Sequence, residues 1–96
     1  MFAVIFKAEI RLADDAYWET AAKLRKLASD TYGCLNLTTV QEGVHEVTIS
    51  YWDTEEQIER WRRDPLHRQA QQIGKKKWYR HYTVEIAEVK RSYHSS

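Results

Sequence analysis

The sequence predicts a single α+β domain, in which a four-stranded antiparallel sheet carries helices on one face. Three observations lead to this prediction. Stretches of apolar residues suited to strands begin and end the 96-residue chain, two more such stretches meet at a glycine in the middle, and segments with helical apolar spacing separate them. The resulting order, β-α-β-β-α-β, is at this length the ferredoxin-like split arrangement.

The first strand is expected at Phe2 to Ile10, which carries apolar residues on both faces near its start. Asp14 or Asp15 can cap the helix that follows, because a carboxylate accepts from the free backbone amides of the first turn. Gly33 supplies a natural stop for this helix. Its apolar stripe contains Tyr17, Ala21, Leu24, Leu27 and Ala28.

Two strands joined by a turn are expected in the middle of the chain, at residues 34–42 and 44–52. Both are rich in Leu, Thr, Val, Ile and Tyr, and the turn falls at Glu42 and Gly43. One face of the second strand holds Val47, Ile49 and Tyr51.

A second helix is expected to start at Thr54, because Gln57, three residues later, completes a capping-box pattern. This helix carries Ile58 and Trp61 inward. Pro65 should break or restart it, since an interior proline removes a hydrogen bond and clashes with the preceding turn.

The second piece of this helix is expected from Leu66 to Ile73, continuing to Gly74. The final strand should then run from about Trp78 to Val89. One of its faces holds Tyr82, Val84 and Ile86, and the other holds Thr83, Ala87 and Val89.

Apolar residues on both faces of the first and last strands indicate that the face away from the helices is covered as well. A second copy of the chain is the expected cover, and two sheets meeting face to face would form a closed α+β barrel with two-fold symmetry. Residues 1–92 are expected to form the domain, and residues 93–96 a loose tail.

Composition excludes several classes of function. The chain has 15 Lys and Arg against 14 Asp and Glu, a net charge of +1, so its total charge favours neither nucleic acid nor membrane. The one cysteine, Cys34, cannot form an internal disulfide, and no zinc-ligand spacing occurs. The first ten residues lack the features of a signal peptide, so a cytoplasmic location is expected.

Residues 60–80 form a cationic stretch, with eight basic residues and one acidic residue. The basic residues alternate with Trp61, His67, Trp78 and Tyr79, a composition that suits an anionic, planar or aromatic ligand. Nucleic acid fits the same description. The alternative is a set of solvated helix charges in which Lys75, Lys76 and Lys77 complement a helix C-terminus.

His67 is the titratable residue most suited to chemistry, because it follows Pro65 on a helix expected to cover the sheet. Its imidazole could ligate haem iron, transfer a proton or bond a substrate oxygen, or it could be a half-buried structural residue. Trp61, Trp78 and Tyr82 are candidates for either core or cavity wall. No phosphate-binding loop or nucleophile elbow supports NAD, ATP or acyl-enzyme chemistry.

The sequence resembles the antibiotic biosynthesis monooxygenase family, in a poorly characterised bacterial branch related to haem-degrading monooxygenases. The likeness covers almost the whole chain, with the stretch SYWDTEEQIERWRRDPLHRQAQQIG as its most diagnostic part. FAVIFKAEI at the start and KKWYRHYTVEIAEVKR at the end also match. The resemblance implies a homodimer with one ligand cavity per subunit, between the helices and the sheet.

The resemblance also bears on cofactors. Haem-degrading members have a helix-two Trp, which matches Trp61, but Gln71 stands where their haem-ligating His falls. They also use an Asn on the first strand, whereas the only Asn in this chain is Asn36. Cofactor-independent members oxidise electron-rich polyphenols in a shaped cavity.

The leading hypothesis is therefore a monooxygenase for a small aromatic or quinol-like compound, with no tightly bound metal and no cofactor. Trp61, Gln71, Trp78 and Tyr82 would bind the substrate, and His67 would act on its proton. Haem binding or haem degradation through His67 is the first alternative. A non-enzymatic binding or stress-response module of the same fold is the second, and nucleic-acid binding through residues 60–80 is the last.

Overall fold

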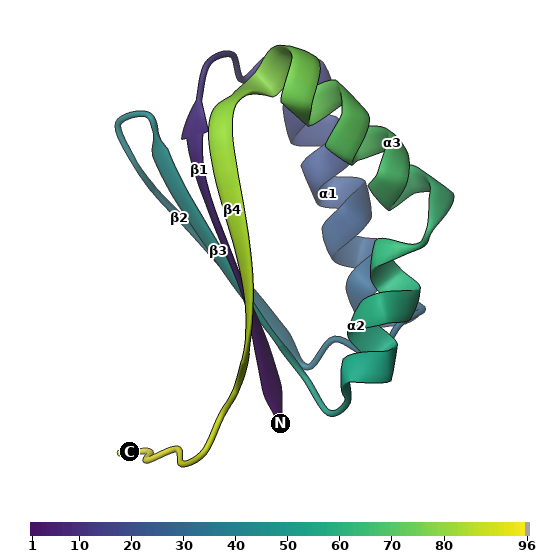
Figure 1. Cartoon of the computed structure of the whole chain (residues 1–96), viewed down its shortest axis with the longest axis vertical. Helices are drawn as coiled ribbons and strands as arrows, with labels where there is room; N and C mark the ends of the chain where they lie inside the picture. Colours follow the sequence, from purple (N-terminus) through teal and green to yellow (C-terminus); the bar gives the residue numbers. More distant parts are fainter. Residues whose placement is uncertain (96) are drawn as a thin grey trace.

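A computed structural model describes residues 1–95 and confirms the predicted fold class. Four strands form one antiparallel sheet in the order β2-β3-β1-β4, and the helices cover one of its faces (Figure 1). In chain order the elements are β1 (Phe2–Ile10), α1 (Asp15–Asp30), β2 (Asn36–Glu42), β3 (His45–Trp52), α2 (Glu55–Arg62), α3 (Pro65–Ile73), the π-helical turn η1 (Gly74–Trp78) and β4 (Tyr79–Glu88).

Strand register decides which side chains face the helices. On β1, Phe6 lies opposite Thr48 of β3 and Val84 of β4, and this row faces the helices. The neighbouring row on the same face joins Glu46, Ala8 and Tyr82. The opposite face carries rows such as Ile5 with Ile49 and Glu85, so the apolar face predicted for β3 points away from the helices.

The tightest packing lies where α2 meets the sheet. Trp52 and Ile58 are 0% exposed, and the indole of Trp61 packs on that of Trp52 with ring centroids 5.1 Å apart. Val4 and Ala28 complete this cluster. The core is thus concentrated beside α2, and the space between α1, α3 and the rest of the sheet is filled less completely.

Side-chain caps start each helix where the sequence indicates. Asp14 accepts the amide of Tyr17 at 2.9 Å at the start of α1. Thr54 and Gln57 form the predicted capping box at the start of α2. Pro65 begins α3 instead of interrupting a longer helix, because a proline at the first helical position loses no hydrogen bond.

Helix α3 lies beside α1 on the same side of the sheet (Figure 1), without burying any residue of Pro65–Ile73 completely. Its backbone stays helical through Gly74 (φ −58°, ψ −46°) and widens into η1. A side chain at Gly74 would lie 2.7 Å from the ring of Tyr79, so only glycine fits there without a shift.

The turn η1 corrects the sequence prediction at one point, because Trp78 belongs to it and the last strand begins at Tyr79. The indole Nε1 of Trp78 donates to Asp14 at 3.2 Å, and Lys77 pairs with the same carboxylate at 2.9 Å. The predicted strand, which starts at Trp78, leaves out this π-helical turn. Residue 96, the end of the tail predicted at 93–96, lies outside the described residues.

No helix within residues 1–95 is long and apolar enough to cross a membrane.

Candidate functional site

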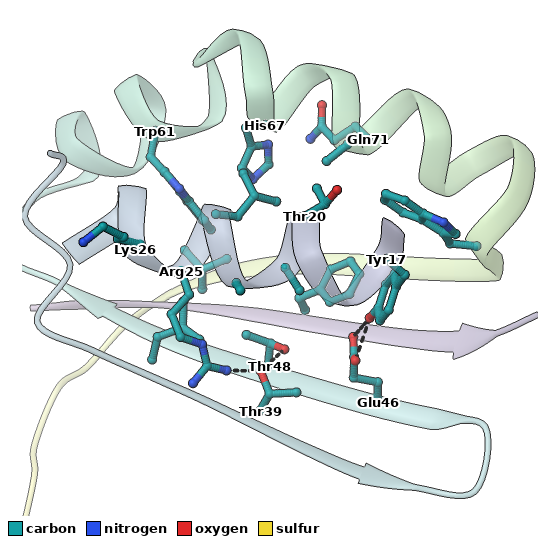
Figure 2. Close-up of a pocket in the computed structure, with 18 of the residues that line it drawn as sticks. Tyr17, Thr20, Arg25, Lys26, Thr39, Glu46, Thr48, Trp61, His67 and Gln71 are labelled. Carbon is teal, nitrogen blue, oxygen red and sulfur yellow. Dashed lines mark hydrogen bonds between the residues drawn. The ribbon is translucent and has the colours of Figure 1, made fainter. Parts of the chain in front are cut away.

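A cavity of about 550 Å³ lies between α1, α3 and the helix-facing side of the sheet (Figure 2). Strands β1 and β4 form its floor with Phe6, Tyr82 and Val84, while Leu24 of α1 and Ala70 of α3 contribute apolar walls. Ligand sites commonly have this size and character, with mostly apolar walls and a few placed polar groups.

All five residues singled out from the sequence line this cavity, namely Trp61, His67, Gln71, Trp78 and Tyr82. Figure 2 shows Trp61, His67 and Gln71 projecting from the helical side toward the cavity. Trp61 serves both the core and the cavity wall, so the two interpretations of this residue are not exclusive. The roles assigned to the five side chains stay predictions.

The imidazole of His67 is held in a desolvated position on the α3 wall. Burial, followed by the positive charge of Arg62, lowers its pKa from 6.5 to about 4, so the ring is neutral at neutral pH. Its Nδ1 is buried and has no hydrogen-bond partner within residues 1–95. A neutral imidazole keeps one unprotonated ring nitrogen, which can accept a proton or a hydrogen bond when a ligand reaches it.

A second polar group lies on the sheet floor. Glu46 is only 4% exposed, and both of its carboxylate oxygens are 2.6 Å from the hydroxyl of Tyr17, which donates to them (Figure 2). The hydroxyl of Tyr79 donates in turn to that of Tyr17 at 3.4 Å. Burial raises the pKa of Tyr79 to about 12 and that of Tyr17 still further, so both phenols remain protonated.

Aromatic rings surround this polar group. Tyr79 contacts Phe6, Tyr17 and Tyr82, and its centroid distances to them range from 5.4 to 5.8 Å. Tyr17 also packs edge to face on Trp78 at 5.3 Å. The cavity therefore offers flat, polarisable surfaces next to a buried carboxylate, an environment suited to an aromatic ligand.

A pair of threonine hydroxyls lies on the β2 and β3 side of the floor. Thr39 of β2 and Thr48 of β3 share a hydrogen bond of 2.8 Å between their Oγ1 atoms. The guanidinium of Arg25, from α1, donates to Thr39 Oγ1 at 3.2 Å, which brings a cation to the cavity (Figure 2).

The sequence patterns did not identify Glu46, Tyr17 or the threonine pair as site residues, and they included Tyr79 only as one aromatic residue of the stretch 60–80. A signal for the floor was present, because the alternation that puts Val47, Ile49 and Tyr51 on one face of β3 leaves Glu46, Thr48 and Ser50 on the other. Polar residues at inward positions of a strand are uncommon and point to a site. Nothing in the local sequence indicated that Tyr17 would meet Glu46.

Half of the basic residues of the cationic stretch 60–80 form ion pairs at the surface. Arg62 and Arg63 contact Glu59, Lys77 contacts Asp14, and Arg80 contacts Glu9. This pattern favours the interpretation as solvated charges.

Metal-binding side chains do not gather in the part of the chain that the structure describes. Among residues 1–95, no group of three or more His, Cys, Asp or Glu side chains is placed to hold a metal ion.

Known proteins resemble this chain in sequence and in structure. The family model for antibiotic biosynthesis monooxygenases matches residues 1–73. The uncharacterised protein YqjZ of Bacillus subtilis (strain 168) is 37% identical over 91 residues, which cover 94% of this chain and 80% of YqjZ.

Two solved structures show the same fold at low sequence identity. Rv0793 of Mycobacterium tuberculosis superposes with a TM-score of 0.81 at 15% identity, covering 95% of this chain and 96% of Rv0793. A mutant of SnoaB, described as a cofactor-independent oxygenase from Streptomyces nogalater, gives a TM-score of 0.78 at 11% identity, covering 95% of this chain and 94% of SnoaB. With a family match over residues 1–73, the chain belongs to the antibiotic biosynthesis monooxygenase family.

Proposed function

We propose that this protein is a monooxygenase for a small aromatic or quinol-like compound, which it binds in the cavity between the helices and the sheet without a tightly bound metal. The observation that supports this most directly is the neutral, unpartnered imidazole of His67 on the wall of an aromatic-lined cavity, as described within residues 1–95. Family membership and the fold shared with SnoaB, an oxygenase described as cofactor-independent, support the reaction class.

In this proposal each residue has a defined task. His67 accepts the proton of a substrate hydroxyl, or orients the phenol oxygen through a hydrogen bond. Trp61, Trp78 and Tyr82 hold the aromatic ring between flat surfaces, and Gln71 donates a hydrogen bond to a ring substituent.

The electrons come from the substrate itself. Loss of the hydroxyl proton leaves a phenolate, whose negative charge is shared with carbon atoms of the ring, and such a carbanionic carbon reduces molecular oxygen. One oxygen atom then enters the ring carbon as a carbonyl, and the other leaves as water. The protein's contribution is to hold the anion in a site that excludes bulk water.

The test measures oxygen consumption with a panel of hydroquinones and polyphenols, comparing wild type with His67→Ala. We expect His67→Ala to lower kcat at least about tenfold, as for loss of a general base, with a smaller change in stability. His45→Ala is the matched control, because His45 is exposed at the start of β3. If His67→Ala lowered activity only as far as its loss of stability explains, His67 would be a structural residue.

The same preparation distinguishes the haem alternative, in which His67 would supply the axial nitrogen. Haem is titrated in with and without oxygen and a reductant, and absorption spectra are recorded. A ligated haem band that decays only when both oxygen and reductant are present would replace the metal-free proposal. A saturable aromatic ligand that causes no oxygen consumption would instead favour the binding module.

We also propose that the protein is a homodimer, whose sheets meet through the faces opposite the helices. Ala3, Ile5, Ile49 and Tyr51 form a shallow apolar pocket on this outer face. Antiparallel sheets that face water normally carry polar residues there, so a second copy is the cover that fits a symmetric α+β barrel.

A further inference from the structure

The carboxylate of Glu46 has more hydrogen-bonding capacity than the protein uses. A carboxylate can accept about four hydrogen bonds, yet within residues 1–95 the side chain of Glu46 accepts only from the hydroxyl of Tyr17. In the same part of the chain, no Lys, Arg or His forms an ion pair with it. Burying such a group is costly unless further donors reach it, and Glu46 faces the cavity.

The neighbouring tyrosines cannot take a proton from a ligand. Both phenols keep their own protons at neutral pH, since burial raises their pKa values. Tyr17 donates to Glu46 and accepts from Tyr79, which fixes the carboxylate at one place on the floor. Glu46 is therefore the proton acceptor at this end of the cavity.

The charges that line the cavity indicate which kind of ligand group would donate a hydrogen bond to Glu46. Arg25, Lys26 and Arg62 line the cavity along with two carboxylates, Asp30 and Glu46. Lys26 is paired with Asp30 and Arg62 with Glu59, so within residues 1–95 Arg25 is the lining cation without a carboxylate partner, and its charge disfavours an ammonium ligand beside it. A neutral hydroxyl group is the donor that suits both the carboxylate and the wall.

We propose that Glu46, held by Tyr17, is a second polar subsite that binds a hydroxyl group of an aromatic ligand and accepts its proton. The O–H bond breaks, the proton moves to a carboxylate oxygen of Glu46, and the electron pair stays on the ligand oxygen as a phenolate.

This subsite defines the substrate class of the proposed function, on which the inference rests. Glu46 projects from the sheet floor and His67 from the α3 wall, so the two acceptors approach the cavity from opposite sides (Figure 2). A ring that reaches both carries two hydroxyl groups at opposite ends, as a para-hydroquinone does.

The test uses 2-naphthol, whose hydroxyl becomes strongly acidic when the ring is excited by light. A bound molecule shielded from water emits as the naphtholate only if a proton acceptor touches its hydroxyl. Excitation beyond the absorption of tryptophan isolates this signal. We expect naphtholate emission with wild type and with His67→Ala, and its loss with Glu46→Gln, which keeps the shape but removes the basic group. Glu19→Gln, on the exposed side of α1, is the control for a carboxylate elsewhere.

Several results would overturn the inference. Naphtholate emission that persists in Glu46→Gln, is absent from wild type, or disappears in His67→Ala would each place the proton acceptor elsewhere. Tighter binding of 2-naphthylmethylamine than of 2-naphthol would assign the subsite to an ammonium group.

A binding comparison on wild type decides the question even if Glu46→Gln does not fold. We expect 2-naphthol to bind about tenfold more tightly than 2-methoxynaphthalene, because the ether cannot donate to a charged acceptor. Equal affinities would refute the subsite. Neither measurement involves oxygen, so the two proposals can fail separately. If the protein binds 2-naphthol in this way but oxidises no quinol, the proposed function is wrong and the Glu46 subsite is still supported.

Discussion

The imidazole of His67 packs edge to face on the indole of Trp61, with ring centroids 4.5 Å apart and an interplanar angle of 73°. Each ring holds a buried nitrogen, Nδ1 of His67 and Nε1 of Trp61, that has no hydrogen-bond partner within residues 1–95. An unmatched buried polar atom costs roughly 1–3 kcal/mol. Both atoms are closed to solvent, so a ligand reaches either of them only if its ring turns, and this pair is the least satisfied part of the cavity wall.

Acid should destabilise the protein through His67. Its pKa is about 4 in the folded chain against 6.5 for an unperturbed histidine, so the unfolded state binds the proton first as pH falls. The free energy of unfolding should fall by at most about 3 kcal/mol between these two pH values. Denaturant unfolding across this range should show a shallower decline for His67→Gln than for wild type and His45→Gln. Parallel declines in all three would contradict the buried, neutral imidazole.

Truncation of Ile58, which is completely buried on α2, should cost much more stability than truncation of an exposed leucine. Its side chain is 0% exposed within the cluster formed by Trp52 and Trp61, and Ile58→Ala should lower the free energy of unfolding by about 2–5 kcal/mol. Leu12→Ala, at a position that is 44% exposed, should cost less than about 0.5 kcal/mol. Urea unfolding measures both variants, and similar costs would disprove the position of the core.

Gly74→Ala should disturb the cavity from outside it. The added methyl group would lie 2.7 Å from the ring of Tyr79, so this ring must move away from Tyr17. We expect a loss of about 1–3 kcal/mol together with a changed near-ultraviolet circular dichroism spectrum. Gly43→Ala is the matched control, because its methyl group meets open space and only the positive φ of 59° is strained. An unchanged aromatic spectrum in Gly74→Ala would refute the contact.

A charge on the outer face of the sheet should separate the proposed dimer. Ile49 lies opposite Ile5 in the middle of that face, so Ile49→Lys would bury two ammonium groups at a symmetric interface. Sedimentation analysis should show a dimer for wild type and a monomer for Ile49→Lys. Glu19→Lys, on the exposed side of α1, should remain dimeric. A monomeric wild type, or a dimeric Ile49→Lys variant, would rule out this arrangement.

Most of the fold could be predicted from local patterns because its elements are locally specified. The capping box of Thr54 and Gln57 and the proline at the start of α3 locate helix starts without tertiary information. The turn η1 could not be predicted in this way. In the folded chain the ring of Tyr79 packs against Gly74, where a side chain would not fit. This close approach is a tertiary contact, and no local sequence pattern specifies it.

The candidate site was predictable mainly on its helical side, and Tyr82 of β4 was the one floor residue among the predicted site residues. His67 and Gln71 are four residues apart on α3, so helical spacing brings them to a common wall, and Trp61 lies near the end of α2, just before that helix. The hydrogen bond between Tyr17 and Glu46 joins residues 29 positions apart. Its formation depends on how α1 crosses β3, and no periodicity within either element specifies that crossing.

Helix α3 follows α2 at one end and continues into η1 at the other, while its middle lies over the cavity with no completely buried residue between Pro65 and Ile73. Few buried contacts mean that such a segment opens at a lower free energy than the strands beneath it. A molecule that fills the space beneath supplies the packing that the helix lacks. Binding of a substrate and ordering of α3 are then one coupled equilibrium. A compound that fits the cavity well should therefore slow amide hydrogen exchange along α3.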